Sequence, residues 1–158
     1  MKRILTVLLT VAFLLIANHV ALATDYDIEM VVPDGKKSKE TDAVMRTNQN
    51  DFQVVIEKTK FKSNEKTFNY SDIKVADYSY SKKPMLSGGG AVATALLVGF
   101  IFALPFLFIK KKNHWLAVQT DKEFAVLKLD GSNYRAILAD LRTHGVNVKE
   151  VQEEVKKK

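Results

Sequence analysis

Two apolar segments, a short turn and an amphipathic segment follow one another in HWLAVQTDKEFAVLKLDGSNYRAILADL, residues 114–141. Segments 115–120 and 124–129 have the length of strands and are apolar on both faces, so we expect a hairpin that is buried on both sides. A helical spacing of i, i+3, i+4 and i+7 follows, and its apolar positions are Tyr134, Ile137, Leu138 and Leu141. This part of the chain therefore predicts two paired strands and one amphipathic helix.

The ends of this helix are also indicated by the sequence. Ser132 or Asn133 can cap its N-terminus through a side-chain oxygen, and Gly145 stands where a left-handed C-cap residue is expected. We assign residues 110–148 to this second polar section. Residues 149–158 then form a charged tail or a frayed continuation of the helix.

The stretch just before it is AVATALLVGFIFALPFLFI, residues 91–109, which holds no charge and is followed by Lys110, Lys111 and Lys112. As a helix it would be about 28 Å long, close to the thickness of one hydrocarbon core. With the glycines at 88–90 as a hinge, residues 88–109 are predicted to be a transmembrane or membrane-inserted segment.

The number of crossings stays open at this point. Hydropathy and the basic residues after the stretch favour a single span, with residues 24–87 outside and 110–158 inside. Pro105 would end a helix that begins at Ala91 after about 14 residues, which is short for a crossing. A helical hairpin, a re-entrant element or an interfacial insertion is therefore the alternative.

Small residues recur every fourth position in this stretch, which would let a second helix approach closely. They are Ala91, Ala95, Gly99 and Ala103. The pattern predicts a homo-oligomer formed through the membrane helix, although Ala and Gly are common in membrane helices generally.

The first 23 residues predict export. Lys2 and Arg3 precede an apolar run, and Ala21-Leu22-Ala23 offers small residues to a signal peptidase, so residues 1–23 are either a cleaved signal peptide or an uncleaved anchor. The chain contains no cysteine, which excludes disulfides, thiolate metal sites and a lipid-modified cysteine. We expect a cell membrane location, in a bacterial inner membrane.

Residues 24–87 have the pattern of a β meander with four or five short strands. The expected strands are 27–32, 43–46, 52–56, 67–70 and 73–80. Pro33-Asp34-Gly35 predicts a turn, residues 47–51 a hairpin connection, and Lys36 to Glu40 a solvated run of charges.

Neither polar section buries much apolar surface alone, whereas joined they give six or seven antiparallel strands and one C-terminal helix. Residues 68–75, 78–83 and 114–138 carry a resemblance to bacterial pleckstrin-homology-like (PH-like) domains, particularly those of small uncharacterised exported membrane proteins. The resemblance implies an α+β fold, an antiparallel β-rich module with one C-terminal amphipathic helix, interrupted here by a hydrophobic membrane helix. It also implies a scaffold that binds lipid or protein.

Several function classes find no support in the sequence. The formal charge of +6 is concentrated after the apolar stretch and does not form an aromatic-interleaved basic surface, so we expect no nucleic-acid partner. We find no histidine pair with metal-ligand spacing, no nucleophile motif and no carboxylate pair with contrasting environments. We therefore expect no enzyme, no cofactor and no metal site.

The leading hypothesis is a non-catalytic, membrane-anchored envelope protein that acts as a protein-interaction or scaffolding module for an unidentified protein partner. The alternative is a PH-like module that engages anionic lipid headgroups through residues flanking the apolar stretch. These are Lys82, Lys83, Lys110, Lys111, Lys112 and Trp115. A stop signal that only sets topology is the simpler explanation of the lysines.

Overall fold

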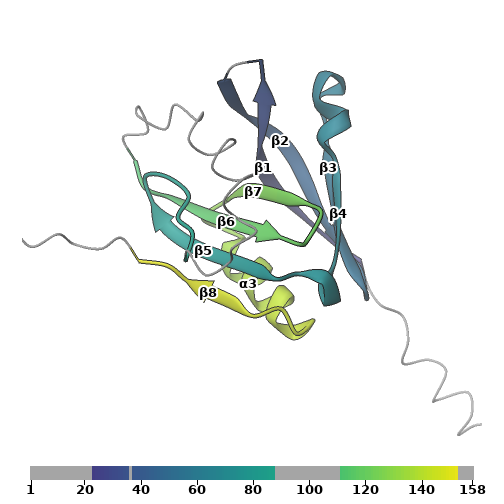
Figure 1. Cartoon of the computed structure of the whole chain (residues 1–158), viewed down its shortest axis with the longest axis vertical. Coiled ribbons are helices and arrows are strands. Elements are labelled where there is room, and N and C mark those ends of the chain that lie inside the picture. Colours follow the sequence, from purple (N-terminus) through teal and green to yellow (C-terminus); the bar gives the residue numbers. More distant parts are fainter. Residues whose placement is uncertain (1–22, 36, 88–110, 153–158) are drawn as a thin grey trace, which may run out of the picture.

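The computed structural model describes residues 23–35, 37–87 and 111–152. Within these residues the strands are β1 (Thr24–Asp34), β2 (Lys37–Thr47), β3 (Asp51–Ile56), β4 (Lys66–Asn69), β5 (Val75–Ser81), β6 (Asn113–Gln119), β7 (Phe124–Leu129) and β8 (Val148–Glu150). They form one sheet in the order β4-β3-β2-β1-β7-β6-β5-β8. The helix α3 (Tyr134–Thr143) and the 3-10 turns η2 (Thr59–Asn64) and η3 (Tyr70–Asp72) complete the fold (Figure 1).

The first section is the expected meander, with a longer first hairpin than the sequence indicates. β1 and β2 pair along their whole length around Gly35, whose φ of 67° suits the turn. Lys37 to Glu40 therefore lie in a strand, where the sequence indicated only a solvated run of charges. The strand forms because its partner, Val31 to Asp34, offers a complete row of backbone hydrogen bonds that outweighs the local preference of charged residues.

The two polar sections join in one sheet, as the buried-surface argument predicts. β7 pairs with β1 over Ile28 to Met30, and β5 pairs with β6 over seven residues, from Val75↔Gln119 to Ser81↔Asn113. The core draws on both sections, and α3 packs onto it through Ile137, Leu138 and Leu141. The helical stripe predicted from the sequence is thus confirmed.

The pairing of Ser81 with Asn113 places the two ends of residues 82–112 side by side. A single crossing would put these ends on opposite sides of a membrane, so the single-span arrangement favoured by hydropathy is wrong for this fold. Lys110 and residues 91–109, with their small-residue stripe, lie outside the described residues. Among the residues that are described, no helix combines the length and the apolar character that a membrane crossing needs.

The region around α3 differs from the sequence prediction at both ends. Asn133 is the N-cap residue but makes no side-chain capping bond; its amide instead donates to the carbonyl of Asp27 at 2.7 Å. Asp130 holds the turn by accepting hydrogen bonds from the backbone and hydroxyl of Ser132. Gly145 has a φ of 82°, as expected for its C-cap role.

The segment after Gly145 is not simply a charged tail. Residues 148–150 form β8, which lies parallel to β5 and extends the sheet by one strand. The strand is short, with a single buried side chain, Val148. The segment is a strand because its backbone hydrogen-bonds to the edge of β5. A sequence of three residues carries no local pattern from which this pairing could be predicted.

A second, smaller apolar cluster lies apart from the main core and contains Val31, Trp115 and Val126. Trp115 is fully buried, and its indole N–H donates to the carbonyl of Ser81 at 3.0 Å. The predicted contact of Trp115 with lipid headgroups is therefore wrong, because the side chain is inside the protein. β6 is a strand buried on both faces, as its sequence predicts.

Residues 82–87 are fastened to β5 by alternate buried side chains of that strand. The amide of Ser87 donates to Asp77 at 2.7 Å, and the amide of Met85 donates to the Ser79 hydroxyl at 3.3 Å. The Ser81 hydroxyl donates to the carbonyl of Lys83. We call residues 82–87 the strap.

Candidate functional site

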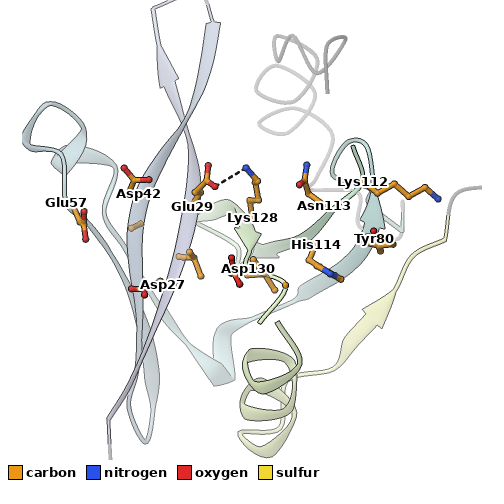
Figure 2. A pocket seen from close by; sticks show the side chains of 14 residues that line it. Asp27, Glu29, Asp42, Glu57, Tyr80, Lys112, Asn113, His114, Lys128 and Asp130 are labelled. Atoms are coloured by element: carbon orange, nitrogen blue, oxygen red, sulfur yellow. Dashed lines mark hydrogen bonds and ion pairs between the residues drawn. The ribbon is translucent and has the colours of Figure 1, made fainter. Parts of the chain in front are cut away.

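A groove of about 530 Å³ crosses the sheet from β1 and β2 to the ends of β5, β6 and β7 (Figure 2). Its polar lining comes from strands that are far apart in the sequence but adjacent in the sheet order. The residues are Asp27, Glu29, Asp42, Glu57, Tyr80, Lys112, Asn113, His114, Lys128 and Asp130. Five carboxylates therefore face two lysines, and the groove is acidic although the chain as a whole is basic.

Lys128 occupies the middle of the groove and is held by two carboxylates. Its ammonium lies 2.9 Å from Glu29 and 2.7 Å from Glu40, which stands beside the groove on β2. Burial works to lower the pKa of Lys128, but the hydrogen bonds and charges of Glu40 and Glu29 outweigh it and raise that pKa above its ordinary value. Burial also raises the pKa of Glu40. The ammonium group of Lys128 is therefore held by Glu29 and Glu40 and does not pair with the other carboxylates of the groove.

The end of the groove at β1 and β2 carries most of the available negative charge. Among the described residues, the carboxylates of Asp27 and Glu57 make no ion pair. Asp42 pairs with Lys58 at 2.7 Å, and the hydrogen bond from Lys58 holds the pKa of Asp42 below its ordinary value. In Figure 2 these three side chains lie on the β1–β2 side of Lys128. This end of the groove can therefore accept a cation.

The opposite end of the groove is aromatic. The rings of His114 and Tyr134 stack at 3.8 Å between centroids, and Tyr80 stacks on His114 at 4.7 Å. Tyr80 is 54% exposed, so its ring is accessible to a bound molecule. The Tyr78 hydroxyl lies 2.7 Å from Nδ1 of His114.

This environment favours the neutral form of His114. Burial lowers the pKa of its imidazole, the charge of Arg135 lowers it further, and Asp130 opposes both effects. A neutral ring can accept the Tyr78 hydroxyl hydrogen at Nδ1 and keep a donor at Nε2. His114 is thus part of the groove wall.

Four of the predicted headgroup contacts come together beside the aromatic end of the groove, and one of them, Lys112, also lines it. Because Ser81 pairs with Asn113, Lys82 and Lys83 leave β5 where Lys111 and Lys112 enter β6, and all four are exposed. We call these four residues the lysine edge. Lys110 is outside the described residues, and Trp115 does not belong to the edge because it is buried.

The groove carboxylates were missed by sequence reasoning. They lie on β1 and β2 and just after β3 and β7, and only the sheet order brings these segments together. One signal was present, because Asp25, Asp27 and Glu29 alternate along β1 and so point to the same face of the strand. Within the described ranges, no group of three or more His, Asp or Glu side chains is placed to hold a metal ion.

Comparisons with known proteins bear on the fold. No family model matches this chain, and no curated protein matches it in sequence. The hSac2 domain from the human phosphoinositide phosphatase Sac2 is similar in structure, with a TM-score of 0.52 and 9% identity over 99% of this chain and 92% of that one. A chain in the structure of the Spt16D Pob3N heterodimer has a TM-score of 0.50 and 10% identity, over 89% of this chain and 60% of that one.

Both similar structures are PH-like, and this chain is likewise mostly antiparallel sheet with one helix. The PH-like part of the sequence resemblance is therefore confirmed, while the bacterial exported membrane proteins find no support in these comparisons. At 9–10% identity the likeness establishes the fold alone. The chain has a PH-like fold.

Proposed function

We propose that this chain is a non-catalytic interaction module, held at a cell membrane, whose groove binds an extended basic segment of a partner protein. The observation that carries the proposal is the excess of carboxylates in the groove, with Asp27 and Glu57 unpaired among the described residues. The similar chain in the Spt16D Pob3N heterodimer is part of a complex of two proteins. This is consistent with a protein-binding role for the same fold here.

The chemistry of the groove fits lysine or arginine side chains. Carboxylates form charge-assisted hydrogen bonds with ammonium and guanidinium groups, and these bonds are stronger than neutral ones. The half-exposed ring of Tyr80 is also a surface that suits a cation, and the ammonium of Lys112 lies over it at 6.0 Å from the centroid. A headgroup phosphate is a poor fit here, because it would meet five carboxylates.

The membrane location rests on the sequence. Residues 1–23 predict export and residues 91–109 predict insertion into lipid. The described ends of residues 82–112 lie together, which is consistent with an insertion that enters and leaves on the same side. We propose a hairpin, re-entrant or interfacial insertion and place the module on one face of the membrane.

Binding of a fluorescently labelled oligolysine peptide to the full chain in neutral detergent tests the groove. Removing two exposed charges, in Asp27→Asn with Glu57→Gln, should weaken binding about tenfold in low salt. Asp121→Asn removes a carboxylate from the β6–β7 turn, away from the groove lining, and should leave the affinity unchanged. Equal affinities of all three proteins, or equal binding of oligoglutamate, would contradict the proposed function.

Lipid contact is a second candidate, and the lysine edge favours it. Four exposed ammonium groups stand where the chain leaves and re-enters the described fold, and each lysine near an anionic surface contributes about 1 kcal/mol. The full chain should unfold at a higher temperature in nanodiscs that contain phosphatidylglycerol than in phosphatidylcholine alone. Lys82→Gln with Lys83→Gln should reduce this difference. Lys74→Gln with Lys122→Gln, at the other end of β5 and β6, should not.

A further inference from the structure

Strand β8 directs the end of the described chain toward the groove. β8 runs parallel to β5, with Glu150 opposite Tyr78, and the amide of Val151 donates to the carbonyl of Tyr78 at 2.8 Å. Since the two strands run in the same direction, Gln152 follows β5 toward Tyr80. Tyr80 lines the groove, so the chain reaches residue 152 beside its aromatic end (Figures 1 and 2).

The residues that follow have the required length. Residues 153–158 read EEVKKK, and six extended residues span about 20 Å. From β8 to β1 the sheet order counts four steps, or about 19 Å at about 4.8 Å per strand. A lysine side chain adds several ångströms, so the last lysines can reach the carboxylates of β1.

The charges are complementary as well. Lys156, Lys157 and Lys158 are consecutive cations, and Asp27 on β1 makes no ion pair among the described residues. Glu57 follows β3, two strands farther along the sheet, and is not needed for this contact. A tethered segment of this length meets its site at an effective concentration of the order of millimolar. A weak contact is then enough to keep the groove partly occupied.

We infer that residues 156–158 occupy the acidic groove of their own chain and compete there with a basic segment of the partner. The inference rests on the proposed function, because it takes the groove to be a site for lysine side chains. The chain then regulates its own site, and a partner must displace the lysine tail before it binds.

The first test compares the affinities of full-chain variants for labelled oligolysine. Lys157→Gln with Lys158→Gln should bind the peptide about two- to fivefold more tightly, because the competing segment is weakened. Lys74→Gln with Lys122→Gln removes the same charge on the other side of the fold and should leave the affinity nearly unchanged. An unchanged affinity in the tail variant, with binding still sensitive to Asp27→Asn, would overturn the inference and preserve the proposed function.

A second test does not depend on peptide binding. The chain has no cysteine, so Val155→Cys accepts a single nitroxide label and keeps all three tail lysines. The label should broaden the amide signals of Asp27, Glu29 and Asp130 while sparing Asp121, and high salt should restore them. Unbroadened groove signals would overturn the inference.

A mixture of nitroxide-labelled protein with isotope-enriched protein that carries no nitroxide distinguishes the tail of the same chain from the tail of a second copy. Broadening in that mixture would mean that the tail of a second copy fills the groove, which would also overturn the inference as stated. If instead oligolysine binding is indifferent to every groove substitution, the proposed function fails, and the nitroxide experiment still decides where the tail lies.

Discussion

Ser81 and Asn113 face one another as the last register partners of β5 and β6, although residues 82–112 separate them along the chain. The pair lies at one end of the β5–β6 ladder, which joins the first polar section to the second. The antiparallel neighbour of β5 is β6, which belongs to the second section. The same section contributes α3 to the core. Residues 24–87 and 111–152 are therefore parts of one folding unit.

This pairing predicts that both sections lie on one side of the membrane. Gln49→Cys, in the β2–β3 turn, and Lys122→Cys, in the β6–β7 turn, place exposed thiols in different sections of a chain without cysteine. A membrane-impermeant maleimide added to sealed vesicles should label both variants or neither. Labelling of only one would require an odd number of crossings and would contradict the fold.

Trp115 is predicted to be a structural residue. Trp115→Phe removes the hydrogen bond to the Ser81 carbonyl and should lower the free energy of unfolding by about 1–2 kcal/mol, whereas Trp115→Ala should lower it by about 3–5 kcal/mol. Tyr80→Ala, at an exposed aromatic side chain, should change it by less than about 1 kcal/mol. Chemical denaturation of the full chain in detergent gives these values.

The fluorescence of Trp115 provides an independent measurement, because it is the one tryptophan in the sequence. Its emission should be that of a buried indole and should resist quenching by brominated lipid. Strong quenching by lipid would place the side chain at the headgroups and contradict its burial.

The environment of His114 predicts acid sensitivity. Its folded-state pKa lies below the unfolded value of 6.5, because burial and Arg135 disfavour the charged ring. The unfolded chain therefore binds more protons as the pH falls, and stability present above pH 6.5 is lost as the pH drops below it, by at most about 1.4 kcal/mol per pH unit. His114→Gln should flatten this part of the stability curve. A ring titration by NMR with a midpoint at or above 6.5 would contradict the assignment.

Lys128 is predicted to hold the middle of the sheet together. Lys128→Gln leaves Glu29 and Glu40 close to one another without their cation, so the free energy of unfolding should fall by about 1–3 kcal/mol at neutral pH. Part of the loss should return as the pH is lowered, because protonation of Glu40, whose pKa is raised by burial, removes its repulsion with Glu29. Lys74→Gln breaks only an exposed pair at 3.9 Å and should have an effect below about 1 kcal/mol.

The parts of the fold that follow from local pattern could be predicted from the sequence. The stripe of Ile137, Leu138 and Leu141 and the doubly buried strand β6 each follow from a repeat within a single element. β8 could not be predicted, because its three residues form a strand only against the edge of β5. The charged start of β2 was missed because a hairpin partner can impose extended structure on residues with low strand propensity.

The groove lay beyond prediction for a different reason. Asp27 and Asp42 lie on β1 and β2, and Asp130 directly follows β7, so their proximity depends on β7 pairing with β1 across the sequence. The lysine edge was half predicted: the lysines were recognised individually, and the register of Ser81 with Asn113 explains why they gather. Trp115 was placed wrongly because an aromatic residue beside an apolar stretch suits a headgroup region and a protein interior equally well.

The strap gives the module a means of bearing tension. Asp77, Ser79 and Ser81 hydrogen-bond to the backbone of residues 83–87 at three successive points. A pull applied beyond Ser87 would therefore meet the bond to Asp77 first, with the bonds to Ser79 and Ser81 behind it. The indole N–H of Trp115 also donates a hydrogen bond to the Ser81 carbonyl at the same end of β5. A load on the chain beyond Ser87 would thus pass to buried side chains of β5 and from them into the interior of the sheet.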